Sequence, residues 1–129
     1  MADHLGHVHL KVRDLDRSID FYRDVVELAV TERHEHFAFM SFGDHHHDLA
    51  LQALGGAADP PGQGVGLYHA AFEIPTRGAL RATHERLVER DVTVTPVDHG
   101  ISLALYFDDP DGNGLEVYLD TRAERDRRE

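Results

Sequence analysis

Residues 7–22 read HVHLKVRDLDRSIDFY, and the spacing of the apolar side chains changes within this stretch. Val8, Leu10 and Val12 alternate with polar residues, which predicts a strand with one buried face. From Asp14 onward, apolar residues recur at helical spacing behind an acidic first turn. The stretch therefore predicts a β-strand that leads directly into an amphipathic α-helix.

The same order of elements is predicted twice along the chain. The first helix is followed by three short strand patterns, near residues 29–34, 37–42 and 47–54. Residues 55–66 then hold five of the eleven glycines and two of the five prolines, which predicts a linker. After the linker come a strand, a helix and three more strands: residues 67–74, 76–90, 92–97, 102–107 and 115–119.

The sequence therefore predicts an α+β fold made of two tandem βαβββ modules, at about residues 5–54 and 67–120. The length of 129 residues suits one domain with a real core, so we expect the modules to form a single domain over residues 1–121. Residues 122–129 are charged and are expected to form a C-terminal tail.

The composition excludes several classes of protein. Thirteen basic against 24 acidic residues give 13 − 24 = −11, and this acidity argues against nucleic-acid binding. With a single lysine, the acidity fits either a high-salt host or a GC-rich genome, and this stays open. The chain has no cysteine, no apolar run long enough for a membrane span and no signal-peptide pattern, so we expect a cytoplasmic protein.

Three residues in the polar phase of strand patterns form a candidate metal site: His7, His69 and Glu116. The two histidines occupy matching places in the two modules, because 12 − 7 = 5 and 74 − 69 = 5 to the last residue of each first strand. Two imidazoles and one carboxylate are the ligand set that binds divalent iron on one face and leaves other positions open. A hydrated sheet face would explain any one of these residues alone, but the joint placement favours a metal site.

Two further histidine positions bear on this site. His9 shares a face with His7 and competes with it as a ligand, but the matching position in the second module is Ala71, which favours His7. His47 begins a strand and could act as an acid or base beside the metal. A solvated turn histidine is the competing interpretation of His47, and it is the one we adopt for residues 45–46.

Tyr106 lies on the sparsely filled face of its strand, in phase with Ser102 and Ala104. Its hydroxyl could bond a substrate oxygen there, or the ring could be ordinary packing with its hydroxyl at the rim. His99 precedes Tyr106 by 106 − 99 = 7 residues. The remaining histidines have no partner that the sequence identifies: His4, His34, His36 and His84.

These segments resemble the vicinal oxygen chelate superfamily, which contains glyoxalase I, extradiol dioxygenases, fosfomycin-modifying enzymes and bleomycin-resistance proteins. The resemblance covers about residues 5–120, and its most specific pieces are residues 7–22 and the stretch DDPDGNGLEVY at residues 108–118. It implies that the two modules form a curled mixed sheet around a metal-binding cup. It also implies a homodimer, with all metal ligands from one subunit or His7 from one and His69 with Glu116 from the other.

Within the superfamily, the chain is most similar to the single-domain catechol 2,3-dioxygenase-like branch. The segments that carry this similarity are His47-Asp48-Leu49-Ala50 and Asp98-His99-Gly100 with Ser102 and Tyr106. The resemblance implies an Fe(II) enzyme that opens an aromatic diol with O2, with Mn(II), Zn(II) and Ni(II) as other metals that the ligands allow. It implies catalytic roles for His47, Tyr106 and His99, although His99 stands closer to the tyrosine than is usual.

Other members of the superfamily offer competing functions. A glyoxalase I-like isomerase needs a fourth ligand, for which Gln52 is the available side chain. A fosfomycin-type transferase needs a cationic pocket; Arg122 and Arg125 are near the right end, but Lys11 is the only lysine and the net charge is −11. A metal-free protein that sequesters a drug has no need of three metal ligands. The sequence favours the ring-cleaving dioxygenase.

Overall fold

The computed structural model describes residues 1–124 of the chain. It divides into two compact units, with the boundary between Gly62 and Gln63, inside the segment predicted as a linker. The predicted tail lies partly outside the described residues: residues 122–124 are helical, and 125–129 are not described. Neither of the two long helices, nor any other in the described part, has the length and apolar composition that a membrane span needs.

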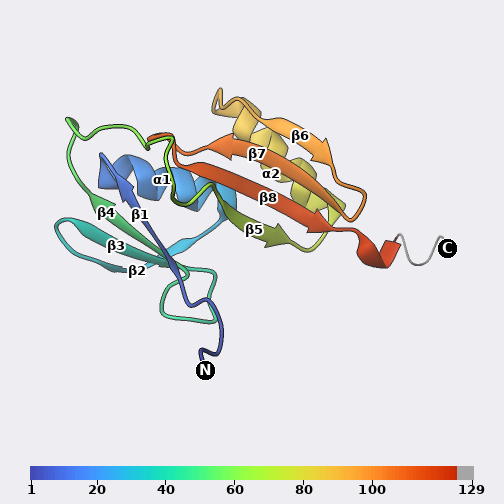
Figure 1. Cartoon of the computed structure of the whole chain (residues 1–129), viewed down its shortest axis with the longest axis horizontal. Coiled ribbons are helices and arrows are strands. Elements are labelled where there is room, and N and C mark those ends of the chain that lie inside the picture. Colours follow the sequence, from blue (N-terminus) through green and yellow to red (C-terminus); the bar gives the residue numbers. More distant parts are fainter. Residues whose placement is uncertain (125–129) are drawn as a thin grey trace. The chain divides into compact units, whose positions relative to one another are not determined.

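The first unit is a four-stranded sheet with one helix packed against it (Figure 1). Its elements are β1 (Val8–Val12), α1 (Leu15–Val26), β2 (Ala29–Arg33), β3 (Phe37–Ser41) and β4 (Leu49–Ala53). The strand order is β1-β4-β3-β2, with β1 parallel to β4 and the other pairs antiparallel.

The second unit repeats this arrangement (Figure 1). Its elements are β5 (Ala70–Ile74), α2 (Arg77–Glu89), β6 (Thr95–Asp98), β7 (Ser102–Asp108) and β8 (Gly114–Asp120). The order is β5-β8-β7-β6, and β5 is parallel to β8. The prediction of an α+β fold with two βαβββ modules is confirmed, and each module forms a mixed sheet of its own.

Capping side chains explain where both helices begin. The Asp14 carboxylate accepts a hydrogen bond from the Arg17 backbone N–H at 3.1 Å, and the Thr76 hydroxyl accepts one from the Ala79 N–H at 3.0 Å. Each cap satisfies a backbone donor that the first turn leaves free. Both helices therefore start where the sequence changes from a period of two to helical spacing.

Each sheet buries one face and leaves the other with most of the polar residues. In the first unit, Leu10, Ala38, Met40 and Leu51 are at most 6% exposed and lie on the face packed against α1. The opposite face, here called the distal face, carries His9, Lys11, Glu32, Phe39 and Gln52. In the second unit the distal face carries Glu73, Tyr106, Glu116 and Tyr118.

Three strands start later than predicted. β4 starts at Leu49, so His47 lies in the loop before the strand rather than at its start, and β5 and β6 each start three residues late. β6 starts at Thr95 rather than Val92, because the Val92 N–H donates to the Leu87 carbonyl at 3.0 Å and completes the C-terminal cap of α2. Asp91 takes the left-handed conformation that this cap requires, with φ 58°. β5 starts at Ala70 rather than Leu67, whose side chain is exposed.

The β7–β8 turn is organised around Asp109, which is only 5% exposed. Its Oδ1 accepts from the backbone N–H groups of Asp111 and Asn113, and its Oδ2 accepts from Asn113 Nδ2, each at 2.9 Å. This carboxylate replaces the backbone partners that the turn residues lack. It thereby fixes where β8 begins.

Replacing Asp109 with alanine should lower the free energy of unfolding by about 1–3 kcal/mol, because three donors lose their acceptor. Urea unfolding followed by circular dichroism would measure the loss. The control is Asp44→Ala, an exposed aspartate in the β3–β4 turn, with an expected change below about 0.5 kcal/mol. Equal effects of the two substitutions would show that Asp109 does not organise its turn.

Candidate metal centre

Two of the three predicted ligands meet within the second unit. His69 is the residue before β5, and Glu116 lies in β8. His69 Nε2 and Glu116 Oε1 are 3.0 Å apart. Glu116 is only 9% exposed, so its charge requires the pairing.

Gly114 makes this approach possible. A Cβ at this position would lie 2.6 Å from the backbone carbonyl oxygen of Tyr68 and 3.5 Å from the Cβ of His69. A real Cβ essentially never comes this close to another atom, so any side chain would push the Tyr68–His69 segment away from β8. The glycine is therefore a steric requirement for the closeness of His69 to Glu116.

The pair fits a shared metal ion. Two ligand atoms that each lie about 2.0–2.2 Å from a divalent ion, at the angle of about 90° of octahedral coordination, are about 3.0 Å apart. The observed separation of 3.0 Å agrees with this value, and it is also the length of a direct N–H···O hydrogen bond between the two side chains. His69 Nδ1 is buried and has no hydrogen-bond partner among residues 1–124, so the Nε2 contact and ring packing hold the imidazole.

Tyr106 and His99 lie beside this pair. Tyr106 is opposite Glu116 in the β7–β8 register, and its ring centroid is 5.7 Å from that of His69. Its hydroxyl oxygen is 2.8 Å from His99 Nε2. Burial, followed by the negative charge of Glu116, raises the pKa of the Tyr106 phenol, so the phenol stays protonated at neutral pH. The structure thus brings four of the predicted site residues together in one unit.

His7 and His47 meet in the first unit. His7 precedes β1, and its ring centroid is 4.6 Å from that of His47. Burial, followed by the positive charge that His7 can carry, lowers the pKa of the His47 imidazole. His47 is therefore neutral at neutral pH and can accept a proton. His9 is instead engaged by Gln52, whose Oε1 is 3.1 Å from His9 Nε2.

The two units use matching positions of the fold. In the parallel strand pairs, Val8 lies opposite Leu49 and Ala70 lies opposite Leu115. His7 and His69 are therefore equivalent, as the sequence predicted. The same register makes Ala50 the counterpart of Glu116, so the first unit supplies no carboxylate at that place. Within residues 1–124, no three His, Asp or Glu side chains come together as a metal-binding group.

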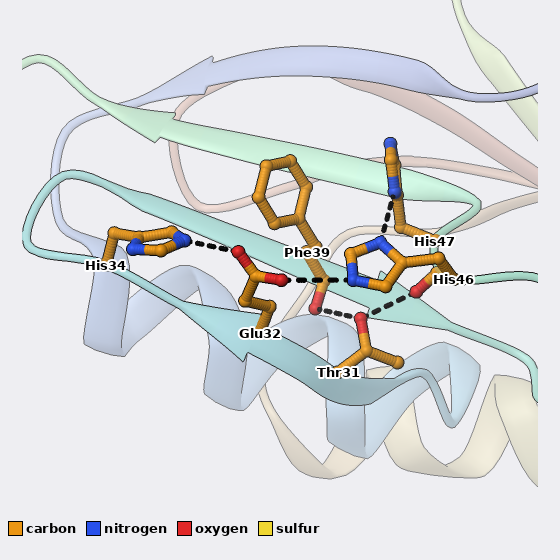
Figure 2. A network of polar contacts seen from close by, with 6 residues as sticks. All are labelled: Thr31, Glu32, His34, Phe39, His46 and His47. Atoms are coloured by element: carbon orange, nitrogen blue, oxygen red, sulfur yellow. Dashed lines mark hydrogen bonds and ion pairs between the residues drawn. The ribbon is translucent and has the colours of Figure 1, made fainter.

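The structure also shows a polar network that the sequence did not reveal (Figure 2). Glu32 accepts hydrogen bonds from His34 Nε2 and, at 3.2 Å, from His46 Nε2. His46 Nδ1 is 2.9 Å from His47 Nδ1. His46 lies in an exposed turn, as predicted, but its ring also contacts Glu32 and His47, and His34 has a partner in Glu32. Glu32 and His46 are 14 residues apart, and the sequence alone does not show that the loop after β3 reaches back to β2.

Comparisons with known proteins agree with this architecture. Residues 4–117 match the Glyoxalase/Bleomycin resistance protein/Dioxygenase superfamily. A catechol-2,3-dioxygenase of Bacillus subtilis (strain 168) is 36% identical over 118 residues, which are 91% of this chain and 41% of the relative. A biphenyl-2,3-diol 1,2-dioxygenase 2 of Rhodococcus globerulus is 31% identical over 117 residues, 89% of this chain and 62% of the relative.

A solved structure has the same fold. The glyoxylase/bleomycin resistance protein/dioxygenase domain from Frankia sp. EAN1pec superposes with a TM-score of 0.81 and 25% identity, covering 93% of this chain and 99% of that chain. The chain therefore belongs to the glyoxalase/bleomycin resistance protein/dioxygenase superfamily, the vicinal oxygen chelate group, whose members use divalent metals. The chain spans about two fifths and three fifths of the two dioxygenases, so membership establishes the class but not the reaction.

Replacing Gly114 with alanine should destabilise the second unit by about 1–3 kcal/mol, because a backbone segment has to move. Thermal unfolding would detect this loss, and the NMR signals of the His69 ring would shift as it leaves Glu116. The control is Gly64→Ala in the same unit, where an added Cβ meets nothing within 4 Å. An unchanged His69 ring signal in the Gly114 variant would show that the close approach does not position the histidine.

Proposed function

We propose that this protein is a metal-dependent extradiol dioxygenase that cleaves a catechol-like aromatic diol with O2. The observation that carries the proposal is the approach of His69 Nε2 to Glu116 Oε1 at 3.0 Å, with the Tyr106 hydroxyl and His99 beside them. The similarity to a catechol-2,3-dioxygenase and a biphenyl-2,3-diol 1,2-dioxygenase, at 36% and 31% identity, supports the proposal.

In this proposal His7, His69 and Glu116 hold Fe(II), within a cup formed by the two modules as a single domain. The first unit would contribute one imidazole, and the second unit the other imidazole with the carboxylate. His7 comes either from the same chain or from a second copy in a homodimer. Bound there, Fe(II) would supply a Lewis acid with open coordination positions and a redox partner for oxygen.

Three side chains would handle protons and orientation. His47 is neutral because of its lowered pKa, so it can accept a proton from a hydroxyl of the diol. Tyr106 keeps its proton and can donate a hydrogen bond to a substrate oxygen. His99, at 2.8 Å from the Tyr106 hydroxyl, orients that hydroxyl.

The charges favour a neutral diol over an anionic substrate. The distal face of the second unit carries the carboxylates of Glu73 and Glu116. Arg122, the cation that a transferase would need, is engaged by Asp120, with Nη2 at 2.6 Å from Oδ2. An arginine already paired with a carboxylate is less available to a phosphonate, and the Glu73 carboxylate would repel one.

The first test is oxygen consumption by anaerobically prepared, Fe(II)-loaded protein on addition of catechol and substituted catechols. The proposal predicts oxygen uptake together with a yellow ring-fission product. If iron is bound and no member of the panel is consumed, the dioxygenase proposal fails. Methylglyoxal with glutathione would then test the isomerase alternative.

Variants should separate metal binding from proton transfer. His7→Ala, His69→Ala and Glu116→Ala should each lose bound iron, measured by metal analysis after desalting, because each removes one of three ligands. His47→Ala should keep the iron but lower turnover by about 10²- to 10⁴-fold. The control His36→Ala removes an exposed histidine, 65% accessible, and should change neither property. Full iron retention by the Glu116 variant would exclude the proposed ligand set.

A further inference from the structure

A line of polar contacts leads from the surface of the first unit to His47 (Figure 2). It begins at the Glu32 carboxylate, whose side chain is 45% exposed. It continues through His46, with 3.2 Å from Nε2 to Glu32 Oε1 and 2.9 Å from Nδ1 to His47 Nδ1. His47 in turn lies against His7, so the line ends at a residue of the candidate metal centre.

A β-bulge puts Glu32 at the start of this line. Val30 pairs with Met40 and Glu32 pairs with Phe39, so β2 has one residue more than β3 between these pairs. In an unbroken strand, residues 30 and 32 would lie on the same face, against α1. The extra residue moves Glu32 to the distal face, beside Phe39. On the α1 side Glu32 could not reach His46, so the bulge is what makes this contact available.

The extra residue also anchors the partner loop. The Thr31 hydroxyl donates to the His46 carbonyl at 2.6 Å and lies 3.2 Å from the Phe39 carbonyl (Figure 2). The Phe39 ring packs against both imidazoles, with centroids 5.7 Å from His46 and 4.7 Å from His47. The backbone anchor and the packing thus hold both rings in place. They restrict ring flips, which would otherwise change which nitrogen faces each partner.

The chemistry of the three groups determines the position of the protons. An ionised carboxylate only accepts, so His46 Nε2 carries a proton toward Glu32. In a neutral imidazole the other nitrogen then carries a lone pair, so His46 Nδ1 accepts. With both imidazoles neutral, as at about pH 8, His47 Nδ1 is therefore the donor in the contact of 2.9 Å between the two rings. The lone pair of a neutral His47 is then left on Nε2.

We propose that Glu32 and His46 are positioning residues that fix His47 as the Nδ1–H tautomer, with Nε2 free to act as the base. The tautomer is a property of the first unit alone, and only the role of His47 as a base rests on the proposed function. His34 assists, since it donates to the second oxygen of Glu32 and, as the main cause, lowers the pKa of that carboxyl. Glu32 therefore stays ionised and keeps accepting.

The tautomer can be measured without any metal or substrate. Long-range ¹H–¹⁵N correlation spectra of the full-length protein in a metal chelator, at about pH 8 where imidazoles are neutral, distinguish Nδ1–H from Nε2–H histidines. The proposal predicts the Nδ1–H pattern for His47 and the Nε2–H pattern for His46. An Nε2–H pattern for His47 in the unaltered protein would overturn it.

Substitutions test whether the contacts with Glu32 and His46 determine the tautomer of His47. Glu32→Ala and His46→Ala should each change His47 from one tautomer to a mixture. His46→Gln should restore it, because the glutamine carbonyl can accept from His47 Nδ1–H. The matched control Glu35→Ala removes a carboxylate that is 87% exposed, three residues along the chain, and should leave the pattern unchanged. A single Nδ1–H pattern in both alanine variants would overturn the proposal.

Turnover provides the second measurement. In the Fe(II)-loaded protein, Glu32→Ala should lower kcat for the diol by about 10- to 100-fold with KM and bound iron unchanged. An unchanged kcat in a variant that shows mixed tautomers would overturn the positioning role. If the unaltered protein consumes no diol, the proposed function fails while the tautomer result is still decided by the spectra.

Discussion

The parallel pairing of first and last strands, β1 with β4 and β5 with β8, is the constraint on which the rest of the structure depends. Parallel neighbours need a crossover connection, and in each unit a helix and two further strands form it, with the helix covering one face of the sheet. The pairing also sets the residue before the first strand beside the start of the last strand. His7 and His69 occupy this place, and the His69–Glu116 pair is a direct result of it.

The two units have kept this frame and changed the side chains at equivalent positions. Phe39 lies opposite Ala50 in the first unit, where Tyr106 lies opposite Glu116 in the second. One unit therefore offers apolar packing where the other offers a carboxylate and a phenol. The first unit instead places its polar groups one strand further out, in the network of Glu32 with its histidines. The chemistry is divided between the units although the backbones match.

The sequence predicts the element order and most of the site because both depend on strand phase. The alternation around His69 and Glu116 indicates which side chains share a face, and the repeat indicates that His7 is equivalent to His69. The network around Glu32 could not be predicted in this way. Assigning alternate residues to opposite faces assumes a regular strand. The bulge between Val30 and Glu32 moves the later residues of β2 to the opposite face. The start of β6 also differs from the prediction, because Val92, a residue that suits a strand, belongs to the C-terminal cap of α2.

The same bulge affects how related sequences should be compared. One residue more or fewer in β2 between Val30 and Glu32 moves the later residues of the strand to the opposite face, whatever the amino acids are. An acidic residue aligned with Glu32 but without the added residue would face the helix. The number of residues in this part of β2 is then more informative than the identity of any one of them. A relative can have an acidic residue aligned with Glu32 and still lack the contact that Glu32 makes with His46.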